Sequence, residues 1–231
     1  MRQTLLSALV ALLCGFAGAA IWSYSGLGNT QTRDYLVAHP DILPQMAEAY
    51  QRQEAERKLA SVADDVTRAF PGAVLGNPQG STVLVKFTDY GCGFCRASLP
   101  DVEKLIANNP DLKVVVREWP IFEGSEQAAR MALAAAKQGR FEQFYTAMFD
   151  ADAPTPANVE MAARKAGLDL DAARSFAASN EATRELAGNM AMAQSLGFGG
   201  TPSWVVGEQV LEGAVGYEEL SAAVTQAAEA S

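Results

Sequence analysis

Two cysteines separated by two residues are the part of this sequence best suited to chemistry. Cys92 and Cys95 lie in the segment DYGCGFCRAS, which covers residues 89–98. Such a pair can exchange electrons as a dithiol and a disulfide, contribute ligands to a metal site, or form a static structural bridge. The three interpretations predict different partners elsewhere in the chain.

The metal interpretation lacks further ligands. Structural zinc normally takes four Cys or His ligands, but the only other cysteine is Cys14, in an apolar N-terminal run, and the only histidine is His39. We therefore expect no metal, no redox role for Cys14, and a helix-end or surface position for His39. A static structural disulfide is also less expected, because a chain of 231 residues that is 49% hydrophobic can form a core without disulfide bonds.

The residues around the pair predict a strand before it and a helix after it. TVLVKFTD at 82–89 is a β-branched and aromatic run of strand length, and residues 95–110 predict a helix bent at Pro100. A helix N-terminus offers free N–H groups and partial positive charge, which favour the thiolate that attacks disulfides. Cys92 would then attack, and Cys95, about one turn further on, would resolve the mixed disulfide.

The rest of the chain predicts an α/β domain with a helical segment between its halves. A second strand is expected at 111–120, and a strand, turn and strand at 199–215. Residues 71–81 hold three Gly and two Pro, which predicts a linker or turn. The expected helices cover residues 125–149 with an interruption near Gly139, 157–166, 170–178, 181–196 and 216–230.

The first 25 residues predict a targeting segment. Residues 4–22 carry no charge, which suits a signal anchor tethered to the inner membrane, with Trp22 and Tyr24 at the outer interface. The small residues before Ala19 suit a cleaved signal peptide instead. Both alternatives place the rest of the chain outside the cytoplasm, and a buried structural helix is the third.

Residues 26–70 predict a helical arm, broken near His39–Pro40 and bent at Pro44. Apolar residues recur at helical spacing on both sides of the charged segment QRQEAERK. An amphipathic helix must cover its apolar stripe. The arm would either fold back on its own domain or pair with copies of itself, giving a homo-oligomer through residues 31–70.

Several segments together resemble the DsbA-type thiol–disulfide oxidoreductases of the thioredoxin superfamily. They are VLVKFTDYGCGFCRASLPDVEKL, LKVVVREWPIF, AARMALAA and LGFGGTPSWVVGEQVLEGAVGYEEL. The resemblance runs from about Asn77 to the C-terminus. In addition, YLVAHPDILPQMAEA resembles the arm of the ScsC-like branch, in which such arms can mediate oligomerisation.

The resemblance implies a thioredoxin fold over residues 71–231, with a helical insertion at about 121–196 and no cofactor. It implies a Thr201–cis-Pro202 step beside Cys92, where the Thr201 backbone can bind an extended substrate chain by β-augmentation. Gly93 and Phe94 complete the implied substrate-binding set. The implied partners are unfolded or misoxidised exported proteins, and a membrane protein or thioredoxin-like donor that resets the pair.

Two departures from the family pattern affect the chemistry. Strongly oxidising relatives carry Pro-His between the cysteines, whereas this chain carries Gly93 and Phe94, so we expect a less oxidising couple. Many relatives carry Glu six positions before the first cysteine, where this chain has Lys86. A half-buried ammonium there would favour thiolate; alternatively, Lys86 turns to the surface or pairs with an acid.

Two functional classes remain open at the level of sequence. The first is an extracytoplasmic disulfide oxidoreductase, acting as oxidase, isomerase or reductase. The second is a thioredoxin-fold binding module, or a copper-handling one, without redox turnover, because thiolates bind soft metals. Nucleic acid is not an expected partner, since the net charge is −9 and no basic stripe is present.

Overall fold

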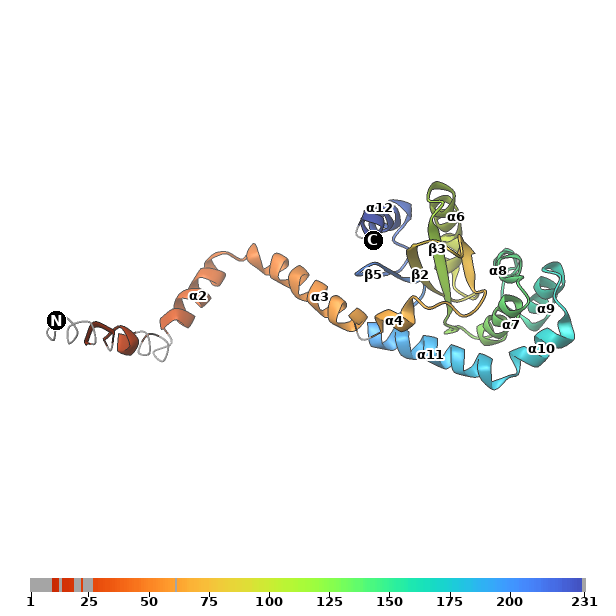
Figure 1. Cartoon of the computed structure of the whole chain (residues 1–231), viewed down its shortest axis with the longest axis horizontal. Helices are drawn as coiled ribbons and strands as arrows, with labels where there is room; N and C mark the ends of the chain where they lie inside the picture. The colour runs from red at the N-terminus through yellow and green to blue at the C-terminus, as the bar shows by residue number, and fades with distance from the viewer. Residues whose placement is uncertain (1–9, 13, 19–21, 23–26, 61, 230–231) are drawn as a thin grey trace. The chain divides into compact units, whose positions relative to one another are not determined.

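The computed structural model describes residues 10–12, 14–18, 22, 27–60 and 62–229. The chain divides into two compact units, residues 1–53 and 54–231 (Figure 1). The first unit contains most of the arm, and the second contains the sheet and both active-site candidates, Cys92 and Cys95.

The arm consists of two helices separated by a short turn. Helix α2 covers Leu27–Ala38 and helix α3 covers Ile42–Ala60, so the break predicted near His39–Pro40 is confirmed. Pro44 falls in the first turn of α3, where a missing N–H removes no helical hydrogen bond, so the helix continues through it without a break. His39 lies at the helix end, exposed and stacked on Tyr35.

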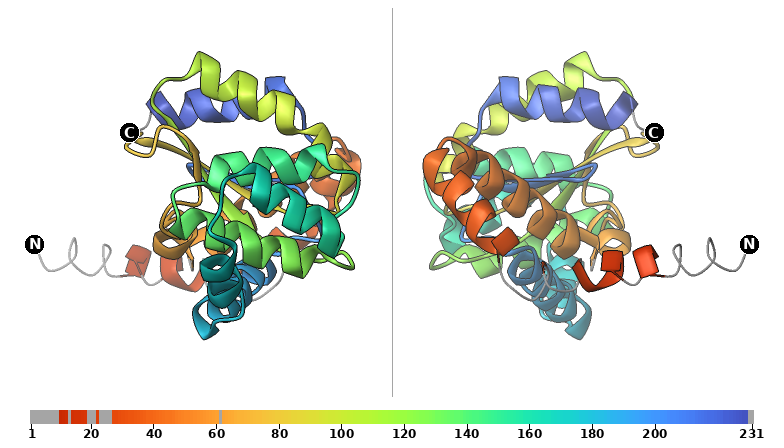
Figure 2. Two further views of the ribbon diagram at one scale, coloured as in Figure 1. Left: turned by 90° about the vertical axis from the view of Figure 1, so that its right-hand side faces the viewer. Right: turned by 90° about the vertical axis from the view of Figure 1, so that its left-hand side faces the viewer.

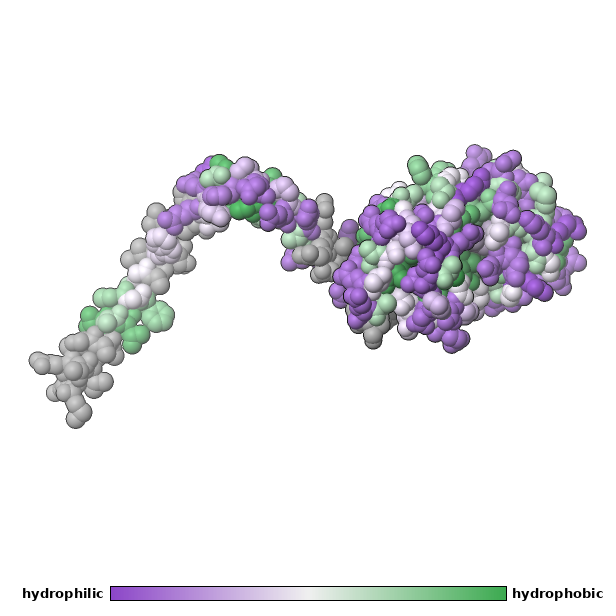
Figure 3. All heavy atoms as spheres, turned by 90° about the horizontal axis from the view of Figure 1, so that it is seen from above, coloured by the Kyte–Doolittle hydropathy of each residue, from purple (hydrophilic) through white to green (hydrophobic). Residues whose placement is uncertain are grey.

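The arm carries large apolar side chains that are exposed to solvent. Apolar (green) atoms are visible along it in the space-filling view of Figure 3. The exposed large side chains on the two helices are those of Tyr35, Leu36, Val37, Leu43, Met46 and Tyr50.

Much of the expected membrane segment over residues 4–22 lies outside the described residues. The helices that the structure does describe include none that is both long enough and apolar enough to cross a bilayer. Cys14 falls within the described part, in a helical stretch, and its side chain is exposed.

The second unit is built on a five-stranded mixed sheet in the order β1-β3-β2-β4-β5. The central strands β2 (Thr82–Thr88) and β3 (Leu112–Glu118) are parallel, and every other neighbouring pair is antiparallel. Strands β4 (Ser203–Val206) and β5 (Gln209–Glu212) form a hairpin through Gly207 and Glu208. The strands predicted from sequence are confirmed in position and order.

Strand β1 (Val74–Gly76) lies inside the segment that the sequence assigned to a linker, so that prediction was wrong there. Its three residues pair antiparallel with Lys113, Val114 and Val115 of β3. The Gly and Pro content suggested a turn, but tertiary pairing with an edge of the sheet overrides local preference. Burial of Leu75 against the core adds to this pairing.

The two faces of the sheet bury separate cores, because alternate residues of a strand point to opposite faces. On β2, Leu84 belongs to the larger core, which also contains both cysteines, whereas Val85 and Phe87 belong to the smaller core. Helices α6 (Leu99–Asn108) and α12 (Tyr217–Glu229) cover the larger core side by side (Figures 1 and 2).

A block of five helices separates β3 from β4, as the implied insertion requires. Its members match the sequence-based helices to within a residue or two, with the interruption at Gly139, which adopts a positive φ of 66°. They are α7 (Ser125–Lys137), α8 (Phe141–Asp150), α9 (Pro156–Lys165), α10 (Leu170–Ala177) and α11 (Asn180–Leu196).

The compact domain begins earlier than the boundary at residue 70 that the sequence suggested. Leu59, at the end of α3, and Val66, at the end of α4 (Ala63–Val66), are buried in the smaller core beside Val205. Residues 54–70 therefore belong to the domain, because their apolar side chains complete one of its two cores.

Candidate active site

Cys92 is the N-cap residue of the short helix α5 (Gly93–Ala97), which follows β2 after a short loop. Its backbone is extended, and its Sγ accepts a hydrogen bond from the N–H of Cys95 at 3.3 Å. The thiol of Cys92 in turn donates to the carbonyl oxygen of Thr201 at 3.1 Å. The first sulfur therefore lies where free helical N–H groups can stabilise negative charge.

Cys95 lies one turn further along α5 and is fully buried. Burial raises the pKa of its thiol to about 11, because a low-dielectric surrounding disfavours the charged form. Neither thiol is in a disulfide in this structure.

The loop that faces Cys92 contains the cis peptide bond Thr201–Pro202 that the resemblance implied. Hydrogen bonds fix this loop to its surroundings: the hydroxyl of Ser203 donates to the carbonyl of Gly200 at 2.7 Å, and the N–H of Gly213 donates to the carbonyl of Pro202 at 2.8 Å. The structure thus brings Thr201 and Pro202, distant in sequence, to the attacking sulfur.

Asp89 links the cysteine loop to the loop after β3. One carboxylate oxygen accepts the N–H of Gly91 at 2.6 Å and also the Ser125 hydroxyl. The other accepts the N–H groups of Ile121 and Phe122 at 2.6 and 2.9 Å. Asp89 therefore shapes the two loops by accepting hydrogen bonds from four donors.

Three apolar side chains are exposed around Cys92. Phe94, between the cysteines, is 69% exposed, and Ile121 and Phe122 are 44% and 48% exposed. The Asp89 hydrogen bonds fix the backbone of the last two, and Phe122 lies close to Gly91, the residue that precedes Cys92. The sequence points to Phe94 through its place between the cysteines, whereas Ile121 and Phe122 carry only the signal of an apolar pair in a loop after a strand.

Lys86 is fully buried on the face of β2 that points toward the cysteines. Its Nζ donates to the hydroxyls of Ser98 and Tyr145, each at 3.0 Å, and to the carbonyl of Cys95 at 3.5 Å. The surface position weighed from sequence is therefore wrong. The acid partner is also absent from the described residues, where Lys86 forms no ion pair with a carboxylate.

Burial lowers the pKa of Lys86 from 10.5 to about 8, and negative charge on Cys95 and Cys92 opposes this shift. Nearby Glu118 is also buried, and burial raises its pKa well above the usual range. It accepts a hydrogen bond from the hydroxyl of Tyr90 at 2.9 Å. The site thus pairs two thiols with a buried amine and a carboxyl group that favours its neutral form.

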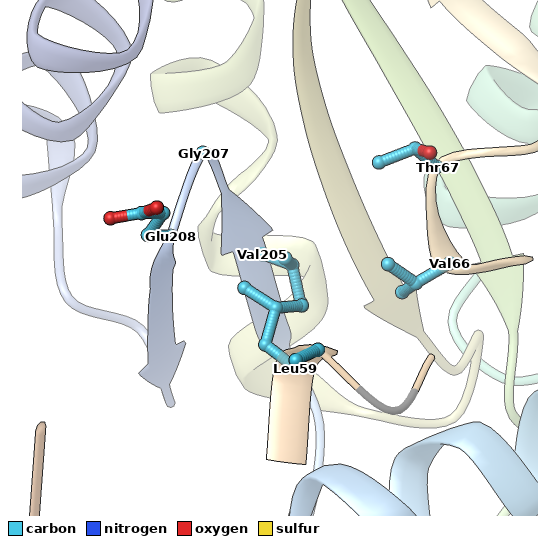
Figure 4. Close-up of a pocket in the computed structure, with 7 residues that line it drawn as sticks. Leu59, Val66, Thr67, Val205, Gly207 and Glu208 are labelled. Atoms are coloured by element: carbon cyan, nitrogen blue, oxygen red, sulfur yellow. The ribbon is translucent and has the colours of Figure 1, made fainter. Parts of the chain in front are cut away.

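A separate pocket of about 490 Å³ lies away from the cysteines (Figure 4). Its lining includes Leu59, Val66 and Val205, which belong to the smaller core on the opposite face of the sheet from Lys86. The pocket is therefore no part of the cysteine site.

The fold and the paired cysteines define a thiol–disulfide oxidoreductase domain of the thioredoxin class. Comparison with protein families agrees: residues 83–225 match the DSBA-like thioredoxin domain, and residues 32–57 match the copper resistance protein ScsC N-terminal domain. The chain belongs to the DsbA-like thioredoxin domain family.

Solved structures with the same fold extend this result. A thioredoxin-like oxidoreductase from Silicibacter pomeroyi DSS-3 is 41% identical, with a TM-score of 0.65 over 68% of this chain and 92% of that one. A linker-deletion mutant of Proteus mirabilis ScsC is 26% identical, with a TM-score of 0.73 over 88% and 94% of the two chains. A periplasmic thioredoxin-like protein from Salmonella enterica serovar Typhimurium is 25% identical, with a TM-score of 0.64 over 72% and 95%.

A curated relative is much longer than this chain. The Na(+)/H(+) antiporter NhaA 3 of Salinispora tropica is 28% identical over 158 residues, which cover 67% of this chain but 24% of the antiporter. The chain spans about a quarter of the length of the curated relatives that it matches.

Proposed function

We propose that this protein is an extracytoplasmic thiol–disulfide oxidoreductase that exchanges disulfides with other proteins through Cys92 and Cys95. The observation that carries the proposal is the position of Cys92. Its sulfur caps α5, accepts the Cys95 N–H, and lies 3.1 Å from the Thr201 carbonyl of the cis-proline loop. That is the place for a nucleophile that must be ionised and reachable by a peptide.

The proposed reaction has two displacement steps. When the pair acts as a reductant, the Cys92 thiolate attacks a substrate disulfide, and one substrate sulfur leaves as a thiolate. Cys95 then attacks Cys92, the internal disulfide forms, and the second substrate sulfur leaves. Oxidation of a substrate dithiol is the same sequence in reverse.

The substrate surface follows from the groups around the sulfur. We propose that the Thr201–Pro202 loop binds the substrate main chain, while Gly93 leaves room for it and Phe94, Ile121 and Phe122 contact apolar side chains. Exposed apolar groups suit unfolded or misoxidised exported proteins, which present apolar segments without a fixed sequence. A membrane protein or a thioredoxin-like donor would reset the pair.

The direction of exchange depends on the redox potential of the pair. The proposed role is oxidase or isomerase. Neither Gly93 nor Phe94 adds positive charge beside Cys92, which supports a potential less oxidising than that of relatives with Pro-His. Equilibration with reduced and oxidised glutathione measures this potential, and a strongly reducing value would exclude an oxidase.

Turnover of insulin disulfides tests the proposed function directly. We expect the wild type to reduce insulin with a dithiol donor and Cys92→Ser to lose this activity. Cys95→Ala should accumulate mixed disulfides with its substrates, and identification of these adducts in cells would name the clients.

Equal insulin reduction by the wild type and Cys92→Ser would instead favour the second function, binding or copper handling without redox turnover. The N-terminal match to the copper resistance protein ScsC supports copper handling as this second function. No group of three or more His, Cys, Asp or Glu side chains suited to a metal occurs among the described residues.

An extracytoplasmic location is part of the proposal. The uncharged run at residues 4–22 and the likeness to a periplasmic thioredoxin-like protein support it. Fractionation of cells that express the full chain, followed by N-terminal sequencing, would separate a tethered protein from one cleaved near Ala19.

The proposal also includes formation of a homo-oligomer through the arm, over residues 31–70. Exposed apolar side chains of α2 and α3 between Tyr35 and Tyr50 support it, together with the ScsC N-terminal match at 32–57. Because residues 54–70 belong to the compact domain, the sharper test removes residues 1–53 only. An unchanged number of subunits by light scattering would contradict assembly through the arm.

A further inference from the structure

The surroundings of Cys95 contain a buried cation whose hydrogen-bond partners are all neutral. Lys86 donates to the hydroxyls of Ser98 and Tyr145 and to the carbonyl of Cys95. Three aromatic rings enclose its Nζ, with centroids 5.2 to 5.8 Å away, those of Trp204, Tyr145 and Phe149. A fully buried ammonium is costly unless negative charge is available to it.

Ionised thiols can supply that negative charge. Negative charge on Cys95 or Cys92 raises the pKa of Lys86, as does negative charge on Glu118 of β3 and Asp101 of α6. Glu118 favours its neutral form, because burial raises its pKa. On α8, burial likewise raises the pKa of the Tyr145 hydroxyl, which therefore stays protonated.

Two further groups around the Cys95 sulfur have unused hydrogen-bonding capacity. The hydroxyls of Thr88 and Thr201 are buried and have no well-formed hydrogen bond within the described parts of the chain. Both nevertheless act on Cys95 and lower the pKa of its thiol. Buried polar groups normally have partners, and a thiolate at Cys95 would accept from both hydroxyls.

We propose that Lys86, together with the hydroxyls of Thr88 and Thr201, forms a preorganised site that stabilises the Cys95 thiolate and speeds the second step of exchange. The inference rests on the proposed function, because it takes Cys95 as the resolving thiol. Lys86 is a positioning residue here: it acts through Cys95 and does not touch the substrate.

The step at issue can be followed with glutathione disulfide. The Cys92 thiolate attacks it, releases one glutathione thiolate and carries the other glutathione as a mixed disulfide. Cys95 loses its proton to solvent and attacks the Cys92 sulfur; the Cys92–Cys95 bond forms, and the bond to glutathione breaks. Two electrons have then passed from the cysteine pair to glutathione disulfide, which leaves as two thiols after protonation.

The experiment measures the lifetime of this mixed disulfide. The reduced full chain is mixed with glutathione disulfide, quenched with acid at successive times between pH 6 and 9, and analysed by intact mass spectrometry. The variants are Lys86→Met, Thr88→Val and, as a matched control, Lys113→Met, which removes a lysine of β3 outside the site.

We expect the mixed disulfide of Lys86→Met to persist about tenfold longer than that of the wild type, the effect of one pKa unit on the resolving thiol. Its decay should also need a higher pH, which a merely structural role of Lys86 would not cause. Thr88→Val, which lacks one hydrogen bond, should prolong the lifetime by roughly threefold to fivefold. Lys113→Met should match the wild type.

A lifetime and pH profile of Lys86→Met equal to those of Lys113→Met would overturn the inference. If Lys86→Met fails to fold by near-UV circular dichroism, Thr88→Val decides in the same way: a wild-type lifetime overturns the inference, and a longer one supports it. Failure of the proposed function is distinguishable, because the wild type itself would then form no adduct, or would form it on Cys95.

Discussion

Two neighbouring strands each bury one cationic side chain, and only one of the two has a carboxylate partner. Lys86 of β2 faces the larger core, whereas Arg117 of β3 aligns with Phe87 and faces the smaller core. Arg117 pairs with the carboxylate of Glu185 at 3.0 Å and donates to Asn189 at 3.2 Å. Lys86 has only neutral acceptors.

The partners of Arg117 explain what it does. Besides Glu185, it donates to the main-chain carbonyls of Asp65, Val66 and Arg68. It therefore fastens the segment after α4 to the sheet, and its charge is compensated within the fold. The difference indicates two roles. Arg117, which has its own carboxylate partner, stabilises the fold, whereas Lys86, which has none, is placed to stabilise the negative charge that forms on Cys95 during the reaction.

Removal of Arg117 should have the largest effect on stability. Arg117→Met leaves the Glu185 carboxylate and several buried acceptors without a donor, which costs about 3–5 kcal/mol when a buried pair is broken. Lys86→Met leaves no carboxylate unpaired, so it should leave stability unchanged or raise it by about 1–4 kcal/mol. Urea unfolding of the reduced variants measures both; equal losses would contradict the distinction between the two cations.

The pH dependence of stability should reveal the uncompensated charge of Lys86. Because its pKa falls from 10.5 to about 8 on folding, the unfolded chain holds the proton more tightly between these values. Stability due to Lys86 is therefore lowest below about pH 8 and rises toward pH 10.5, by about 3 kcal/mol in total.

The difference in unfolding free energy between the wild type and Lys86→Met follows this effect up to pH 10.5, because burial keeps the Cys95 thiol mostly protonated over that range in both folded proteins. A difference that stays constant from pH 7 to 10.5 would show that Lys86 is not destabilised by burial.

Asp89 extends the comparison to a buried anion. The Asp89 carboxylate accepts hydrogen bonds from four donors. Like the Arg117 guanidinium, it therefore has hydrogen-bond partners within the fold. Asp89→Asn replaces one acceptor oxygen by an NH2 group that faces donors, so we expect a loss of about 1–3 kcal/mol. Insulin reduction should slow as well, because Ile121 and Phe122 are no longer held in place. Wild-type stability in this variant would mean that the loops are fixed by other contacts.

The smallest effect should come from Glu185, the partly exposed partner of Arg117. Glu185→Gln keeps an acceptor oxygen but removes the negative charge, so we expect a loss of about 1 kcal/mol. Thermal unfolding at low and high salt checks this, since screening should shrink the difference. A loss as large as that of Arg117→Met would mean that Glu185 alone compensates Arg117.

Much of the domain could be predicted because its signals are local. The β-branched run before Cys92 and the Ala-rich insert fix their own secondary structure, and the cysteine spacing on a strand-to-helix junction fixes the position of Cys92. Strand β1 could not be predicted, because three residues between Gly and Pro carry no strand pattern and depend on pairing with β3.

The site was predictable for the residues that carry a motif, and less so for those that support them. Cys92, Thr201 and Pro202 meet as the resemblance implied. The sequence left open whether Lys86 was buried or exposed, because one lysine in an apolar strand is consistent with both. The roles of Ser98 and Tyr145 depend on how α6 and α8 pack onto β2, and the role of Thr88, at the end of β2, depends on where α5 places Cys95. Spacing along the chain does not reveal either arrangement.

Gly93 directly follows Cys92, and a Cβ built on it would meet no atom within 4 Å. Its neighbour Phe94 also projects into solvent. Residues at these two positions can therefore be exchanged without repacking anything beneath them. The oxidising strength of the Cys92 sulfur is open to adjustment by single substitutions there, while the buried surroundings of Cys95 stay unaltered.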